Sequence, residues 1–151
     1  MDDSDKNERD NVKKSTDLFF LAEGRRPRLL LGALTDQKIE SLNYLSSSMA
    51  DLGFDIDIAS MNLNPSQLML QAQENDVHGV VIQVASKNLS TIQTQLDQYL
   101  SSSSDDETQI FLQSNSIIEK ISQGLRHKQV SLISDDLSPV QTAVFILDKL
   151  S

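Results

Sequence analysis

The chain contains no cysteine and no tryptophan, and only 5% of its residues are aromatic. The absence of cysteine excludes disulfides, thiolate metal sites and a cysteine nucleophile. Basic residues are also scarce: 13 Lys and Arg stand against 22 Asp and Glu, so the formal net charge of the 151 residues is −9. This acidic balance argues against a nucleic-acid partner and against an anionic membrane.

Long hydrophobic runs are missing as well. No window approaches the roughly 20 apolar residues that a membrane span needs. No basic segment followed by an apolar segment opens the chain, so we expect no signal peptide. A length of 151 residues suits one domain with a tail, which buries about two-thirds of its unfolded surface. The sequence therefore predicts a cytoplasmic protein without a membrane span.

Residues 1–22 differ in composition from the rest of the chain. Met1 to about Lys14 is charged and nearly devoid of large apolar residues, which predicts a flexible, disordered tail. Thr16 to Glu23 includes the apolar run Leu18–Leu21 and predicts a short, linker-like helix that ends at Gly24. That helix either lays its apolar side chains on the domain or docks on another protein. The domain itself is expected over residues 23–151.

Short apolar runs typical of buried strands alternate with segments whose apolar residues recur at helical spacing. The expected strands are 29–34, 54–58, 79–85, 110–112 and 130–133, and the expected helices are 39–52, 65–72, 89–100, 117–125 and 139–150. This alternation predicts an α/β fold with a flavodoxin-like, doubly wound five-stranded parallel sheet in the order 2-1-3-4-5. Ligands of such sheets bind at the carboxyl ends of the strands.

Three blocks of sequence carry a resemblance to a known family. They are Glu-Gly-Arg-Arg-Pro-Arg-Leu-Leu at 23–30, Ala-Asp-Leu-Gly-Phe-Asp-Ile-Asp-Ile at 50–58 and Glu-Asn-Asp-Val-His at 74–78. Together they resemble the cobalamin-binding domain of methylmalonyl-CoA mutase, over about Glu23 to Leu150. In such mutases this domain follows a TIM-barrel catalytic domain, which has no counterpart in the 151 residues. The resemblance implies a cobalamin-binding-domain-like fold, with residues 1–22 corresponding to the linker.

The first cofactor motif of that family is Asp-x-His-x-x-Gly, whose histidine is the lower cobalt ligand. Here it matches Asp36 to Ser41, so Lys38 replaces the histidine and Ser41 the glycine. An ammonium group has no lone pair to offer, and the neighbouring Asp36 favours the charged form of Lys38. Two simpler roles stay open, because Asp36 also suits a helix N-cap and Lys38 a solvated first turn.

The remaining cofactor motifs of the family also differ here. Its Ser-x-Leu motif matches Gln83 to Ala85, and its Gly-Gly pair matches Ser114 and Asn115, where any Cβ narrows the slot for the nucleotide tail. Gly32 stands where the family usually has a lysine. The resemblance thus implies a cobalamin-binding fold that has lost its cofactor, with these candidate positions: Asp36, Lys38, Ser41, Gln83, Ala85, Ser114 and Asn115.

Nothing in the sequence assembles a catalytic site. His78 and His127 are far apart in the chain and are expected to be structural, so no metal site is predicted. No glycine-rich phosphate loop and no Gly-x-Ser-x-Gly elbow occurs, and no nucleophile, base and oxyanion hole come together. The chain alone is not expected to be an enzyme. As part of one, it would belong to a mutase-type isomerase.

The leading hypothesis is a non-catalytic regulatory or interaction subunit. It would dock on a mutase-type barrel subunit through Leu18–Leu21 and the carboxyl ends of the strands, without a histidine-ligated cofactor. One alternative is a genuine cobalamin-carrying small subunit of a split acyl-CoA mutase, which holds adenosylcobalamin with the cofactor's own base on cobalt. Another is a sensor of a smaller polar ligand in the same cleft. The partner's identity and a possible dimer stay open.

Overall fold

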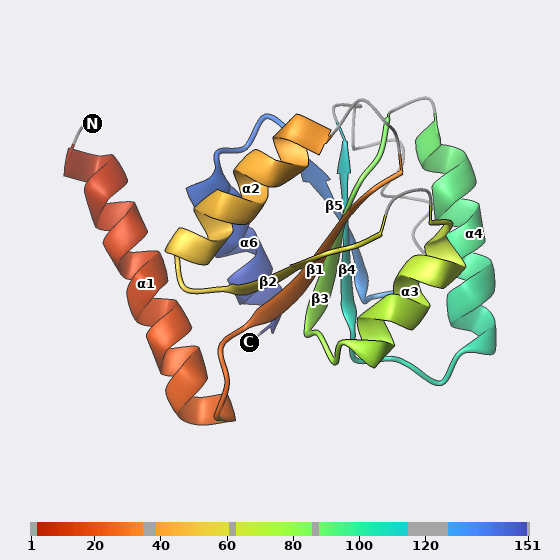
Figure 1. Cartoon of the computed structure of the whole chain (residues 1–151), viewed down its shortest axis with the longest axis horizontal. Helices are drawn as coiled ribbons and strands as arrows, with labels where there is room; N and C mark the ends of the chain where they lie inside the picture. Colours follow the sequence, from red (N-terminus) through yellow and green to blue (C-terminus); the bar gives the residue numbers. More distant parts are fainter. Residues whose placement is uncertain (1–2, 35–38, 61–62, 86–87, 115–126, 151) are drawn as a thin grey trace.

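The computed structural model describes residues 3–34, 39–60, 63–85, 88–114 and 127–150. Within these ranges, five strands form one parallel sheet in the order β2-β1-β3-β4-β5 (Figure 1). The predicted flavodoxin-like α/β fold and its strand order are confirmed. The strands are β1 (Arg28–Ala33), β2 (Asp55–Ile58), β3 (Gly79–Gln83), β4 (Gln109–Ser114) and β5 (Val130–Ser134).

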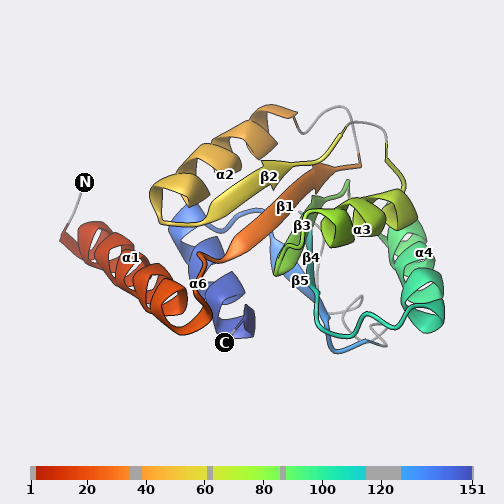
Figure 2. The same cartoon turned by 60° about the horizontal axis from the view of Figure 1, so that its bottom comes forward.

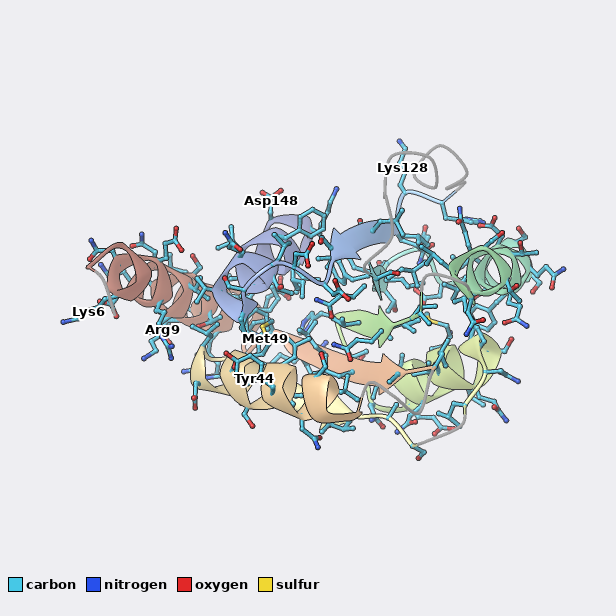
Figure 3. All side chains as sticks on the ribbon, turned by 90° about the horizontal axis from the view of Figure 1, so that it is seen from above. Lys6, Arg9, Tyr44, Met49, Lys128 and Asp148 are labelled. Atoms are coloured by element: carbon cyan, nitrogen blue, oxygen red, sulfur yellow. The ribbon has the colours of Figure 1, made fainter. Side chains whose placement is uncertain are left out.

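Helices cover both faces of the sheet. One face packs against α3 (Pro65–Glu74) and α4 (Leu89–Ser102), and the other against α2 (Ile39–Asp51) and α6 (Pro139–Leu150) (Figures 1 and 2). Alternate residues of a strand face opposite sides, so Leu30 lies in the cluster with α3 and α4, whereas Leu29 and Leu31 lie in the cluster with α2 and α6. Met49 of α2 points into this second cluster and is fully buried (Figure 3).

Side chains cap the amino ends of two helices. Asn64 and Gln67 form a reciprocal capping box at the start of α3, with Pro65 in its first turn. Ser138 and Gln141 exchange the same pair of hydrogen bonds at the start of α6. The helix expected over 117–125 lies outside the described residues. Among the described helices, none is long and apolar enough to cross a membrane.

The amino-terminal segment is where the structure departs from the prediction. One helix, α1, runs from Asp3 to Glu23, so the predicted disorder up to about Lys14 is wrong. Its apolar contacts explain the difference, because Val12 is buried in the cluster formed by α2 and α6. A single buried valine on the correct face provides packing that the charged composition of the segment does not suggest.

The apolar run at the end of α1 is mostly not laid on the domain. Leu18, Phe20 and Leu21 are exposed. The Phe19 ring lies edge-on to His78, and the exposed Phe20 ring lies 5.6 Å from the Arg26 guanidinium. The expectation that all four side chains cover the domain is therefore wrong. The alternative, that they contact another protein, stays a hypothesis.

A close backbone approach attaches α1 to the turn between α2 and β2. The Thr16 hydroxyl donates a hydrogen bond to the Leu52 carbonyl oxygen over 2.9 Å, and Thr16 is fully buried. The next residue, Gly53, has a φ of +103°, and a Cβ there would collide with the Thr16 hydroxyl. Only glycine suits both the backbone angle and the space.

Candidate functional site

Three polar side chains meet at the carboxyl end of the sheet, on the face covered by α2 and α6. Gln83 and Gln113 are partners in register at the ends of β3 and β4. The Gln83 amide nitrogen donates to the Gln113 amide oxygen over 3.0 Å and to the hydroxyl of Ser41, in the first turns of α2, over 3.3 Å. The resemblance to the mutase family implied Gln83 and Ser41 as site positions, and the structure brings them into direct contact.

This amide pair is deeply buried and carries no charge. Gln83 is 4% exposed and Gln113 is 5% exposed. Within the described part of the chain, the Gln83 Oε1 atom has no hydrogen-bond partner. A buried acceptor without a donor is unfavourable by about 1–3 kcal/mol, so this atom suits a ligand or a water molecule that donates a hydrogen bond.

Ser114 lies at the same end of the sheet but on the opposite face. It follows Gln113 in β4, so its side chain shares the orientation of Leu112, which packs in the cluster with α3 and α4. Ser114 is 2% exposed, and its hydroxyl oxygen has no partner among the described residues. The structure therefore separates Ser114 from the Gln83–Ser41 contact instead of joining them in one cluster.

Gly32 of β1 faces the same side of the sheet as Ser114. A Cβ built on Gly32 would lie 2.8 Å from a methyl group of Leu68 in α3. A long side chain such as lysine would therefore require Leu68 to move. The resemblance placed a lysine of the mutase family at this position, and the packing of α3 against β1 here leaves no space for it.

Of the other predicted site positions, the structure describes only Ala85. Ala85 is half-buried beyond the end of β3, and its carbonyl oxygen accepts the Asn88 backbone N–H just before α4. Asp36, Lys38 and Asn115 lie outside the described residues.

The imidazole of His78 is at the amino end of the sheet, immediately before β3. Its Nδ1 accepts the backbone N–H of Arg28 over 2.9 Å, which leaves the hydrogen of the neutral ring on Nε2. Burial lowers the pKa of His78, and Arg25 adds to this effect, against the opposing influence of Glu23 and Asp76. His78 is thus held neutral as part of the strand's attachment to β1.

His127 is also on the amino side of its strand, three residues before β5. Its Nε2 is 3.9 Å from a carboxylate oxygen of Asp97 in α4. No group of three or more His, Cys, Asp or Glu side chains that could hold a metal ion occurs among the residues described. The two histidines lie in separate surroundings, one beside Arg28 and the other beside Asp97.

Cobalamin held through a histidine does not fit the described residues at the carboxyl end. Both histidines of the chain lie at the amino ends of strands. The position of the family's serine carries the longer Gln83, which is bonded to two neighbours. The first position of the family's glycine pair carries Ser114, whose Cβ and hydroxyl are buried.

Sequence reasoning did not find two features of the molecule. Gln113 was not singled out, although a polar residue at the end of an apolar strand is a signal that it shared with Gln83. A groove of about 900 Å³ between α1 and α6 was also missed. Its signal was the spacing of Val12, Ser15 and Phe19, which recur on one helical face.

Comparison with known proteins gives relatives in one family. The chain is 36% identical to methylmalonyl-CoA mutase of Escherichia coli over 72 residues, 47% of this chain and 10% of that protein. It is 32% identical over 99 residues to the methylmalonyl-CoA mutase large subunit of Streptomyces virginiae, 64% of this chain and 14% of that protein. The human mitochondrial methylmalonyl-CoA mutase is 35% identical over 85 residues, 56% of this chain and 11% of that protein.

The resemblance to the methylmalonyl-CoA mutases is confirmed. The matched part is consistent with a cobalamin-binding domain of the mutase family, but it is shorter than the predicted stretch from Glu23 to Leu150. The chain spans only about a tenth to a seventh of the length of these relatives. No protein family model matches it.

A solved structure also supports the fold. A pilus assembly-related protein of Burkholderia pseudomallei superposes with a TM-score of 0.58 at 11% sequence identity, over 82% of this chain and 88% of the other. The superposition shows a shared fold alone, since a fold does not imply a function.

Proposed function

We propose that the chain is a non-catalytic regulatory or interaction subunit, related to methylmalonyl-CoA mutase, that works without cobalamin held by a histidine. The observation that carries the proposal is the position of its imidazoles. His78 and His127 lie at the amino ends of β3 and β5, and the described carboxyl end offers amides and hydroxyls instead. Neutral amides and hydroxyls are poor ligands for cobalt compared with an imidazole.

The exposed end of α1 supports the interaction half of the proposal. Leu18, Phe20 and Leu21 expose large apolar surfaces on one short segment. A cluster of this kind on a small acidic domain is typical of a protein contact. Since the relatives are methylmalonyl-CoA mutases, the partner we propose is a mutase-type barrel subunit.

A pull-down from the source organism tests this proposal. The tagged chain should recover a mutase subunit, identified by mass spectrometry, and the double variant Leu18→Asp, Leu21→Asp should lose it. Leu70→Asp on α3 is the matched control, because Leu70 is also an exposed leucine on a helix. Recovery of no mutase component by the unaltered chain would contradict the proposal, as would equal recovery by the double variant.

A second function is favoured by two buried oxygens that have no hydrogen-bond partner among the described residues. Gln83 Oε1 and Ser114 Oγ could each accept a hydrogen bond from a small polar ligand at the carboxyl end. The chain would then sense such a ligand in place of cobalamin. A thermal-shift screen of small polar metabolites tests this function, since a ligand that binds only the folded state raises the melting temperature. A shift that persists in Gln83→Leu and in Ser114→Ala would contradict this assignment.

A further inference from the structure

Helices α1 and α6 lie side by side (Figure 2). The groove between them is lined by residues of both helices. Its floor is apolar and includes Val12 and Phe19 of α1 and Leu147 of α6. Val144, on the open side of α6, is 53% exposed. The groove residues of α1 recur at three- and four-residue spacing from Glu8 to Glu23, which places them along one side of the helix.

The charges around this groove have a single sign. Among the described residues that line it, the charged ones are Glu8, Glu23 and Asp148. Asp148 projects outward from α6 (Figure 3), and none of the three carboxylates forms an ion pair with another residue of the described ranges. An apolar floor with acidic edges is complementary to an apolar segment with basic flanks.

The basic residues of α1 are all directed elsewhere. The helix contains Lys6, Arg9, Lys13 and Lys14, and none of them lines the groove. Arg9 instead lines a separate pocket with Tyr44 of α2, and Lys6 and Arg9 project from α1 in Figure 3. This separation of charge within one helix is what gives the groove its acidic edges.

We propose that this groove binds an amphipathic helix of a partner protein whose apolar stripe is flanked by Lys and Arg. The distance from Glu8 to Glu23 along α1 is about 22 Å at 1.5 Å per residue, so the partner helix would have about 16 residues. A second copy of this chain is disfavoured as the occupant, because it carries the same net charge of −9. The inference rests on the proposed interaction function and names the chemistry of its partner.

A pair of synthetic peptides tests the groove on the full chain. Both have about 16 residues and the same leucine stripe at i, i+3, i+4 and i+7; one carries lysine at its polar positions and the other carries glutamate. The lysine peptide should bind at least about tenfold more tightly. Equal binding of the two peptides, or no binding of the lysine peptide, would overturn the proposal.

A matched pair of variants separates groove binding from general attraction between opposite charges. Val144→Asp in the groove and Leu70→Asp on α3 add the same charge at positions that are 53% and 55% exposed. Val144→Asp should weaken the binding of the lysine peptide about tenfold, although it makes the chain more acidic. Leu70→Asp should not weaken that binding. Equal effects of the two substitutions would overturn the proposal, and circular dichroism checks that both variants are folded.

Two further results distinguish this inference from the proposed function. Recovery of a mutase subunit that survives Val144→Asp would overturn the groove assignment and leave the proposed function standing. Sedimentation of the unaltered chain as a dimer that Val144→Asp converts to a monomer would overturn the choice of a foreign partner. A monomer in both cases supports it.

Discussion

The two ends of the sheet hold different kinds of polar side chain. At the amino end, the Arg28 guanidinium is 2.9 Å from the Asp57 carboxylate, and the imidazole of His78 accepts the Arg28 backbone N–H. At the carboxyl end, Gln83, Gln113 and Ser41 share neutral hydrogen bonds. In these two clusters, charged and titratable side chains lie at the amino end of the sheet, and neutral amides and a hydroxyl lie at the ends of β3 and β4, the edge where ligands of such folds bind.

The two ends also differ in how they relate to the mutase family. The amino end attaches strands and helices to one another, and its residues belong to the blocks that resemble the mutases. The carboxyl end differs from the family at Gln83 and Ser114, which occupy cofactor positions. Residues that hold the scaffold and residues that hold a ligand are therefore separated by the length of the strands.

The largest loss of stability is expected at Gly53, where α1 closely approaches the turn between α2 and β2. Gly53→Ala should lower the free energy of unfolding by about 3 kcal/mol, because the new Cβ meets the Thr16 hydroxyl and the backbone is held at positive φ. Urea unfolding followed by circular dichroism measures this loss.

Gly24→Ala is the matched control for this substitution. Gly24 also has a positive φ, of +82°, but nothing lies within 4 Å of a Cβ built there. Gly24→Ala should lower the free energy of unfolding by about 1 kcal/mol, because only the backbone angle is unfavourable for alanine. Equal losses at the two glycines would mean that the contact between α1 and the α2–β2 turn does not constrain Gly53.

The carboxyl end is tested by a double-mutant cycle on the buried amides. Gln83→Leu should lower the free energy of unfolding by about 2 kcal/mol, because the Gln113 amide oxygen loses its donor in a buried site. The double variant Gln83→Leu, Gln113→Leu should recover most of this loss, since both partners are then apolar. Additive losses in urea unfolding would contradict the paired arrangement.

A smaller change in stability should follow from the titration of His78 at the amino end of the sheet. Because the folded state lowers the pKa of His78 below 6.5, the unfolded chain binds the proton more readily. The stability from neutral His78 is therefore fully present above pH 6.5 and declines as the pH falls through the lowered pKa of the folded state. His78→Gln keeps an acceptor for the Arg28 N–H and should reduce this decline.

His127→Gln is the corresponding control for the pH measurement. It removes the other imidazole of the chain, which lies at the amino end of a different strand, beside Asp97. Free energies of unfolding between pH 7 and pH 5 provide the comparison. A decline that is unchanged in His78→Gln would show that this imidazole is not the group responsible.

Much of the fold could be predicted from the sequence because its signals are local. The apolar runs of the strands, the capping pairs that begin at Asn64 and Ser138, and glycines such as Gly53 each act through neighbours in the chain. The start of α1 could not be predicted in the same way. Its burial depends on where Val12 and Thr16 meet α2 and α6, and these contacts join segments that are distant in sequence.

The candidate site was predictable only in its location. The resemblance identified Gln83, Ser41 and Ser114 as positions to inspect. It did not show that the first two are in contact on one face while Ser114 faces the other. Side-chain direction at a strand end depends on register and twist as well as on residue type, so a one-residue step from Gln113 to Ser114 changes the face.

The most direct test of the account is a titration of the purified chain with hydroxocobalamin and with adenosylcobalamin, followed in the visible spectrum. A chain without an imidazole at the carboxyl end of its sheet should leave both spectra unchanged at micromolar protein, and Lys38→His with Ser114→Gly should increase any binding. Tight binding by the unaltered chain, with the spectral change of histidine coordinated to cobalt, would contradict the account.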